Sequence, residues 1–136
     1  MALSADDEKF LDDFEACTLA PAGWGQRELM RMAWLRLANE PFEDALELIR
    51  AGLRNYAAEH KSVIYHDTAT TAFVHLIHLR RQQAPDVSTW EEFIKRNPDL
   101  MDPSKPILEA FYTPELLNAP LSRAKFVGPN RRPFRA

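Results

Sequence analysis

The chain has 136 residues, of which 46% are hydrophobic and 27% charged, and its formal net charge at pH 7 is -3. This composition is that of an ordinary folded soluble protein, and the length fits a single domain. A charge this small neither favours nor excludes any class of partner by itself. The only cysteine, Cys17, excludes an internal disulfide and suits a reducing compartment.

The N-terminal stretch "MALSADDEKF" is acidic and lacks the apolar centre of a signal peptide. No apolar run approaches the roughly 18 residues that a membrane span needs. We therefore expect a cytoplasmic protein that does not contact a membrane.

Helical spacing of apolar residues begins near the N-terminus. Ser4 can cap a first helix, whose acidic opening turn complements the helix dipole. "LAPAGWG" ends that helix, and a second is expected over residues 26–39. After Pro41, a third helix over 42–59 carries the clearest apolar stripe, made of Phe42, Ala45, Leu46, Ile49, Gly52, Leu53 and Tyr56. Gly52 either lets a neighbour approach closely or is simply tolerated there.

A fourth helix is expected to contain "YHDTATTAFVHLIHL", residues 65–79, and to end near Gln83. A short fifth helix follows, with Ser88 and Glu91 at capping-box spacing, and it ends at Asn97-Pro98. Seven prolines then divide the last 39 residues into short helical turns. Thr113-Pro114 has the pattern of an N-cap followed by proline at the first helical position.

No segment shows the alternation of polar and apolar residues that is typical of strands. We predict an all-α, single-domain bundle of about five main helices with a proline-rich, irregular C-terminal segment. The helical domain is expected to span residues 1–127 and an irregular basic tail residues 128–136. The tail could bind phosphates or lie along an acidic surface of this chain or of a second copy, and nucleic acid is the less favoured partner.

Three of the four histidines lie in the fourth predicted helix. At 100° per residue, His66 falls on the same side as Phe73, which faces the core, whereas His75 and His78 fall on the opposite side. The three rings therefore cannot share one metal site on a continuous helix. His75 and His78 alone make too few ligands for a structural or catalytic zinc, so we expect a solvated or interface-lining pair. The remaining histidine, His60, ends the third helix.

The inward position of His66 allows two interpretations. Its ring is either a core group satisfied by hydrogen bonds or part of the lining of a cavity between helices, where it could act as an acid or base. Motifs for nucleophilic, phosphate-loop or zinc chemistry are absent from the sequence, so no cofactor and no metal are expected.

The sequence resembles an uncharacterised family of small bacterial helical proteins. The resemblance rests on Ala33-Trp34, on the run Tyr65-His66-Asp67-Thr68-Ala69-Thr70, and on "NPDLMDPSKPILEAFYTPELL" and "RAKFVGPN" near the end. The family pattern has His-x-x-His-Leu before Ala-Trp and Tyr-His-Glu-Thr-x-Thr further on. The family has no settled activity, so the resemblance implies a helical fold rather than a function.

The departure from the family pattern lies in the second helix. Aligned on Ala33-Trp34, the two family histidines fall at Gln26 and Leu29, so this chain keeps only His66 of three inward histidines. One imidazole, an amide and a leucine do not make a metal site.

Three functions follow as hypotheses. The first is a non-catalytic accessory module that binds a small molecule or a partner protein in an interhelical polar pocket around His66, with Gln26, Tyr65, His66 and Thr70 as ligand-binding residues. The second is an enzyme in which His66 is the catalytic acid or base. The third is an interaction protein that acts through the basic tail. A homodimer is an expected form, because Trp34 flanks the apolar stripe of its helix.

Overall fold

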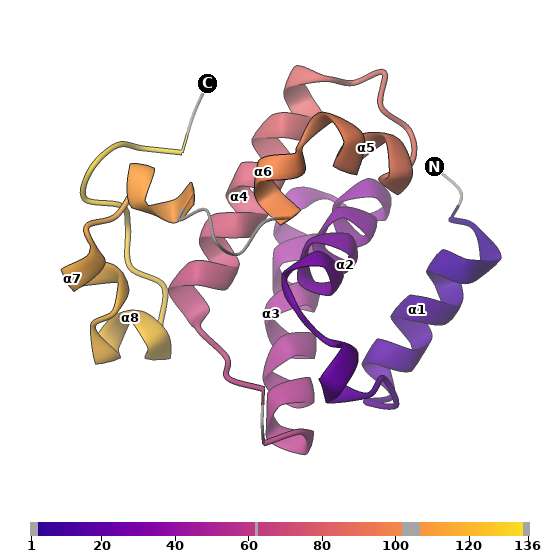
Figure 1. Cartoon of the computed structure of the whole chain (residues 1–136), viewed down its shortest axis with the longest axis horizontal. Helices are drawn as coiled ribbons and strands as arrows, with labels where there is room; N and C mark the ends of the chain where they lie inside the picture. Colours follow the sequence, from indigo (N-terminus) through magenta and orange to yellow (C-terminus); the bar gives the residue numbers. More distant parts are fainter. Residues whose placement is uncertain (1–2, 62, 102–106, 135–136) are drawn as a thin grey trace.

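The structure is a computed structural model, and it describes residues 3–61, 63–101 and 107–134 (Figure 1). Within these ranges every regular element is a helix and no strand occurs. The protein is an all-α single-domain bundle in which five helices are longer than the rest, and short helical turns follow them (Figure 1). The predicted fold class is therefore confirmed.

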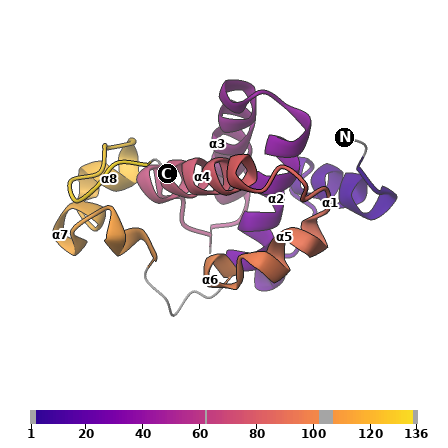
Figure 2. The same ribbon diagram turned by 90° about the horizontal axis from the view of Figure 1, so that it is seen from above.

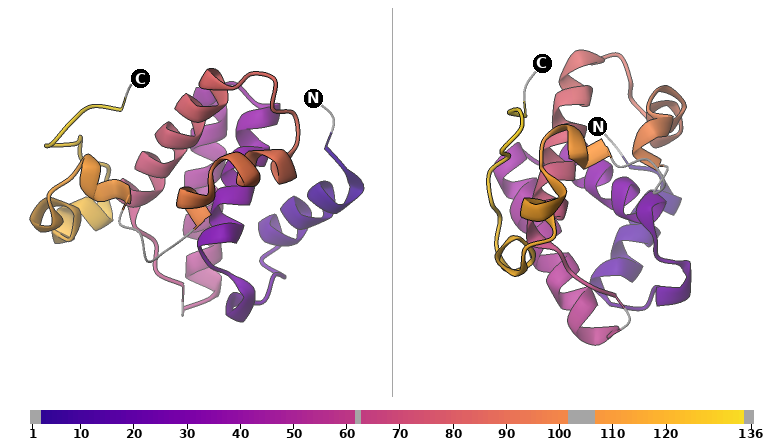
Figure 3. Two further views of the ribbon diagram at one scale, coloured as in Figure 1. Left: turned by 45° about the horizontal axis from the view of Figure 1, so that its top comes forward. Right: turned by 60° about the vertical axis from the view of Figure 1, so that its left-hand side comes forward.

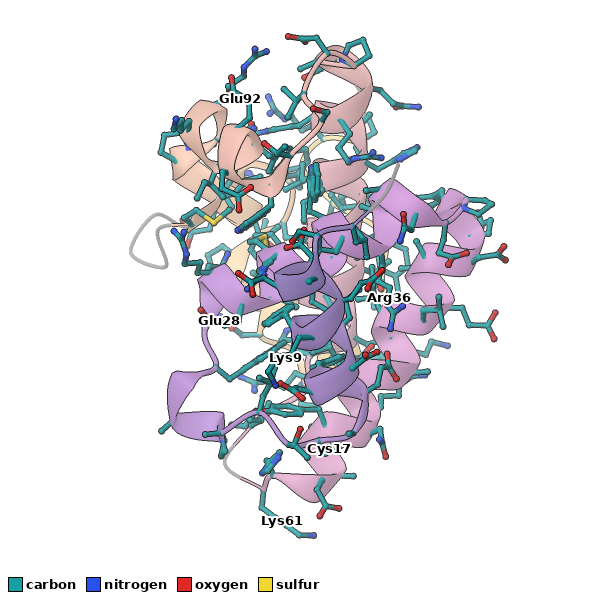
Figure 4. The ribbon with its side chains drawn as sticks, turned by 90° about the vertical axis from the view of Figure 1, so that its right-hand side faces the viewer. Lys9, Cys17, Glu28, Arg36, Lys61 and Glu92 are labelled. Atoms are coloured by element: carbon teal, nitrogen blue, oxygen red, sulfur yellow. The ribbon has the colours of Figure 1, made fainter. Side chains whose placement is uncertain are left out.

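The first helix, α1 (Ala5–Glu15), begins at the predicted cap. The Asp7 N–H donates to Ser4 Oγ at 3.1 Å, and the Asp7 carboxylate accepts from the Ser4 N–H at 3.4 Å, which completes a capping box. At the other end Cys17 has a φ of 60° and occupies the left-handed position that commonly ends helices. Figure 4 shows Cys17 at the foot of α1, near Lys61, and the Cys17 carbonyl lies 2.8 Å from His60 Nε2.

Helices α2 (Gln26–Asn39) and α3 (Phe42–Glu59) follow the 3₁₀ turn η1 (Pro21–Gly23) and have the predicted bounds. The inner side of α3 is buried at Ala45, Ile49, Gly52, Leu53 and Tyr56. A Cβ on Gly52 would lie only 2.8 Å from Phe14 Cε2. The glycine therefore allows close approach of α1, which decides between the two interpretations of its role.

Helix α2 lies at the centre of the bundle, in contact with α3, α4 and the later short helices (Figure 3). Trp34 on this helix is 2% exposed, and its ring packs against the rings of Trp90 and Phe93 at centroid distances of 6.3 and 6.1 Å. Trp34, beside the apolar stripe of its helix, is therefore covered by a later helix of the same chain. This removes the sequence argument for a homodimer.

Helices α4 (Asp67–Gln83) and α5 (Trp90–Arg96) differ from prediction at their starts. His66 precedes α4 as its N-cap in extended backbone (φ -129°), so the helical angle computed for His66 does not apply. Thr89, not Ser88, caps α5, because its Oγ1 accepts from the Glu92 N–H at 3.2 Å. The expected capping box at Ser88 and Glu91 is wrong by one residue.

The C-terminal segment consists of the short helices α6 (Pro98–Met101), η2 (Ile107–Ala110), α7 (Pro114–Leu117) and α8 (Pro120–Ala124). Thr113 caps α7 as predicted, its Oγ1 accepting from the Leu116 N–H at 3.3 Å. Residues 128–134 form no helix, and residues 135–136 of the predicted tail lie outside the described residues. Elements η2, α7 and α8 lie beside α4, at the opposite end of the molecule from α1 (Figure 2).

The buried apolar residues form two clusters. The larger cluster has residues from each of the helices α1 to α6, among them Trp34, Tyr56 and Phe93. The smaller one packs Leu108, Phe111 and Tyr112 of the C-terminal segment against Ala72 and Leu76 of α4. In the described part of the chain, no helix is both long and apolar enough to cross a membrane.

Candidate functional site

Tyr65, His66, Asp67 and Thr68 lie where α4 begins, and the last three hydrogen-bond to backbone groups of residues 117–127. We call these four residues the anchor motif. Sequence reasoning singled out the same run and left two roles open for His66, a core histidine satisfied by hydrogen bonds or the lining of a ligand cavity. In the structure, His66, Asp67 and Thr68 instead form hydrogen bonds with other groups of the protein itself.

Asp67 is the centre of the anchor motif and is fully buried. Arg50 of α3 binds its carboxylate with two hydrogen bonds, Nε to Oδ1 at 2.9 Å and Nη2 to Oδ2 at 2.7 Å. Arg54, one turn further along α3, lies 3.3 Å from Oδ1. The Phe126 N–H donates to Oδ2 at 2.8 Å. Asp67 therefore connects α3, α4 and the chain after α8.

Electrostatic effects at Asp67 oppose one another. Burial alone would raise the pKa of this carboxyl, but the hydrogen bonds from Arg50 and Tyr65 and the charges of Arg50 and Arg54 outweigh it. The net result is a pKa below the ordinary value of 3.8. Asp67 is thus an ionised carboxylate at neutral pH, and its charge is compensated inside the fold.

The Tyr65 hydroxyl donates to Asp67 Oδ1. Burial, together with the hydrogen bond to Asp67, raises the pKa of this phenol to about 12. The guanidinium of Arg54 lies over the ring, 5.3 Å from its centroid. Tyr65 is therefore a neutral donor at physiological pH.

His66 uses both ring nitrogens for the fold. The Ala69 N–H donates to Nδ1 at 3.0 Å, which caps α4. Because Nδ1 accepts, the ring proton is on Nε2, which donates to the Leu117 carbonyl at 2.8 Å. The ring thus joins the start of α4 to the end of α7, and this arrangement corresponds to the interpretation of His66 as a histidine satisfied by hydrogen bonds.

Thr68 completes the contact with the C-terminal segment. Its Oγ1 donates to the Lys125 carbonyl at 3.1 Å and accepts from the Val127 N–H at 3.0 Å. With the Phe126 N–H on Asp67, the backbones of three consecutive residues after α8 are bound by side chains of α4. The anchor motif therefore has a clear mechanical role in positioning residues 117–127.

A small pocket opens next to the anchor motif, between α2, the C-terminal half of α3 and the chain that enters α4. Its volume is about 60 Å³, and it is lined by Trp24, Leu29, Leu53, Val63, Ile64, Tyr65 and Thr70. Ile64 on its rim has 77% of its surface exposed, more than the other exposed large hydrophobic residues in the described part of the chain. The walls are apolar apart from the Thr70 hydroxyl and the polar edge of Tyr65.

Two of the four predicted ligand-binding residues, Tyr65 and Thr70, line this pocket. Gln26 does not; its Nε2 donates to the Leu100 carbonyl at 3.0 Å and so holds α6 against α2. His66 is also outside the lining, as described above. The sequence reasoning missed Arg50 and Arg54, although their spacing of four residues places both on one side of α3.

The remaining histidines serve other contacts. His75 and His78 are half-buried rather than solvated, and Phe42 packs on both, with centroid distances of 5.0 and 4.6 Å. His75 also stacks on Phe134 at 5.1 Å. Burial lowers the pKa of both imidazoles below 6.5, and the charge of the neighbouring His78 lowers that of His75 further. These rings form part of the packing between α3, α4 and the chain end.

In the residues that the structure describes, no three or more His, Cys, Asp or Glu side chains come together as metal ligands would. Comparison of the chain with protein-family models, with curated proteins and with solved structures found no significant match. The resemblance to the bacterial helical family therefore stays a prediction.

Proposed function

We propose that this protein is a non-catalytic accessory module that binds one small apolar group in the pocket beside Tyr65. The pocket itself, with the exposed Ile64 on its rim, is the observation that supports the proposal most strongly. An apolar group of a partner that enters this hollow would leave water together with the Ile64 side chain, which favours binding there. We place the protein in the cytoplasm, in keeping with its single free cysteine.

The size of the pocket limits what it can hold. A cavity of about 150 Å³ takes a benzene ring, so a volume of about 60 Å³ has room for a group of about two or three carbons. A branched aliphatic side chain of a partner protein fits this description better than a free metabolite with several polar groups. We therefore favour a partner protein that inserts one aliphatic side chain over a small-molecule ligand.

The alternative, an enzyme that uses His66 as acid or base, gains no support from the geometry. Proton transfer needs a ring nitrogen within hydrogen-bond reach of a substrate. Both nitrogens of His66 instead pair with backbone groups, the Ala69 N–H and the Leu117 carbonyl.

The proposal is tested with a photo-activated cross-linking amino acid at position 64 in the full chain. We expect one dominant cross-linked protein in cells, and a pocket-filling Leu29→Phe change in the same chain should abolish it. The matched control carries the cross-linker at Ala110, which is exposed and lies outside the lining of the pocket. Cross-links at position 64 that persist in the Leu29→Phe chain, or that equal those at Ala110, would count against the pocket.

A further inference from the structure

The solvent-facing side of α3 is hollowed along most of its length. One hollow, of about 420 Å³, is lined by Glu43, Asp44, Leu46, Glu47, Arg50, Ala51 and Arg54. A second, of about 400 Å³, is lined by Glu40, Asp44, Glu47, Leu48 and Ala51. The two hollows adjoin, because Asp44, Glu47 and Ala51 line both, and we call this surface of α3 the α3 groove.

The α3 groove combines an apolar floor with acidic edges. Leu48 is 38% exposed, and the small Ala51 leaves room beside it. The four acids at its N-terminal half, Glu40, Glu43, Asp44 and Glu47, form no ion pair with any other described residue. In the other half, Asp67 offsets one of the two positive charges of Arg50 and Arg54, so the four acids outnumber the remaining one. The groove therefore presents net negative charge around exposed apolar surface.

A complementary surface occurs at the end of α8. Leu121 is 60% exposed there, and Arg123 and Lys125 are exposed close to it in the chain. Neither basic side chain pairs with an acid of the described chain. The α8 end, apolar with two positive charges, is therefore complementary in charge to the α3 groove, which is apolar with negative charges.

The α8 end is held in place on its own molecule. The Lys125 carbonyl and the Phe126 and Val127 N–H groups are bonded to Thr68 and Asp67. Because this backbone is fixed while its basic side chains are unpaired, the outer side of α8 presents a preformed charged surface. Such a surface binds without the entropic cost of ordering a free tail.

From these surfaces we propose that the protein forms a reciprocal dimer in which the α8 end of each copy, with Leu121, Arg123 and Lys125, docks in the α3 groove of the other. The contact is then made twice about a two-fold axis, the commonest symmetry of homodimers. It is separate from the pocket beside Tyr65, so either proposal can fail alone. The dimer depends on charge pairs at an exposed surface and is therefore weakened by salt.

The test is a charge exchange followed by sedimentation velocity on the full chain at about 50 mM and about 500 mM salt. We expect the unchanged protein to dimerise as its concentration rises, more readily at low salt. Asp44→Lys with Glu47→Lys should give a monomer, and so should Arg123→Glu with Lys125→Glu. A mixture of these two variants should restore the dimer, because each of the two contacts then joins opposite charges.

The matched control is Glu8→Lys with Asp12→Lys, which makes the same change in charge on exposed positions of α1 and should leave the dimer unchanged. Circular dichroism checks that every variant is helical. A protein that stays monomeric under all conditions overturns the proposal. A dimer that forms equally well in both charge-reversal variants also overturns it. A monomer that binds an Arg/Lys-rich peptide through Asp44 and Glu47 also overturns it, because the occupant is then another protein.

Discussion

Asp67 and Arg50 are joined by two parallel hydrogen bonds of 2.9 and 2.7 Å, and the carboxylate is fully buried while 32% of the arginine side chain is exposed. The pair connects the start of α4 to the middle of α3, and through the Phe126 N–H it also connects both helices to the C-terminal segment. The Asp67 carboxylate also accepts from Arg54, from the Tyr65 hydroxyl and from the Phe126 N–H, so a change at Asp67 affects all of these donors at once.

Asp67→Asn should lower the free energy of unfolding by about 2–4 kcal/mol, because the amide cannot accept from all the donors that converge there. Urea denaturation at pH 7 measures the change. Asp86→Asn is the control, since Asp86 is 68% exposed in its pair with Arg96 and should give no measurable loss. Equal losses in the two variants would show that Asp67 contributes no more than a surface charge.

Protonation of His75 should destabilise the protein as the pH falls. Burial and the charge of His78 hold the pKa of His75 below the unfolded value near 6.5, although the nearby Glu43 offsets part of this. The unfolded state therefore binds more protons than the folded state between these two pKa values. Stability is fully present above about pH 6.5 and is lost as the pH falls through that value towards the lower folded pKa.

Thermal unfolding at pH values from about 7.5 to 5 measures this dependence. His75→Phe should flatten it, since a phenyl ring packs between Phe42 and Phe134 but does not titrate. His78→Gln should remove its own contribution and reduce that of His75, because only burial then lowers the His75 pKa. If His75→Phe and the unchanged chain lose stability in parallel, the assignment to His75 is wrong.

Gly52→Ala should destabilise the protein even though alanine favours helix. The gain in helix propensity is about 1 kcal/mol, whereas forcing a methyl group against the Phe14 ring, which a Cβ would approach to 2.8 Å, costs about 1–3 kcal/mol. The ring has little freedom to move because it stacks on Trp24 and packs on Tyr56. We expect a net loss of about 1 kcal/mol in chemical denaturation.

The control is Gly23→Ala, where a Cβ would meet nothing within 4 Å, so this change should be neutral or slightly stabilising. Combining Gly52→Ala with Phe14→Leu should cost less than the sum of the two single changes. Additive costs would mean that the glycine and the ring do not interact.

His66→Asn separates the two hydrogen bonds of the imidazole. Asparagine is a good N-cap and can still accept from the Ala69 N–H, but it is too short to replace the bond to the Leu117 carbonyl. Amide hydrogen exchange should therefore speed up in residues 113–127 while α4 keeps its protection. His66→Ala should also weaken α4, by about 1 kcal/mol. If amide exchange in residues 113–127 of His66→Asn is unchanged, the bond from His66 to the Leu117 carbonyl does not hold this segment.

Features whose partners lie within one helical turn could be predicted from the sequence. The cap at Ser4 and the bounds of α2 and α3 follow from side-chain chemistry and periodicity over a few residues. Where two capping residues are adjacent, as at Ser88 and Thr89, the local pattern does not decide between them. The start of α5 also depends on how Trp90 and Phe93 pack against Trp34, a residue far away in the chain.

The contacts of the anchor motif could not be predicted, because most of its distant partners are backbone groups. His66 binds a carbonyl 51 residues later, and Thr68 binds one 57 residues later. Every residue has a carbonyl, so no residue type marks the acceptor. Asp67 is different, because a buried carboxylate needs cations nearby. Arg50 and Arg54, on one side of α3, could therefore have been predicted as its partners.

The division of the apolar residues into two clusters has a consequence for synthesis on the ribosome, where the chain emerges N-terminus first. The buried residues of the larger cluster all lie between Phe10 and Leu100, so the bundle can condense before the last part of the chain is made. Until Leu108, Phe111 and Tyr112 arrive, Ala72 and Leu76 leave an apolar face of α4 in water. The nascent protein thus passes through a stage in which a chaperone can bind this face of α4, until Leu108, Phe111 and Tyr112 cover it.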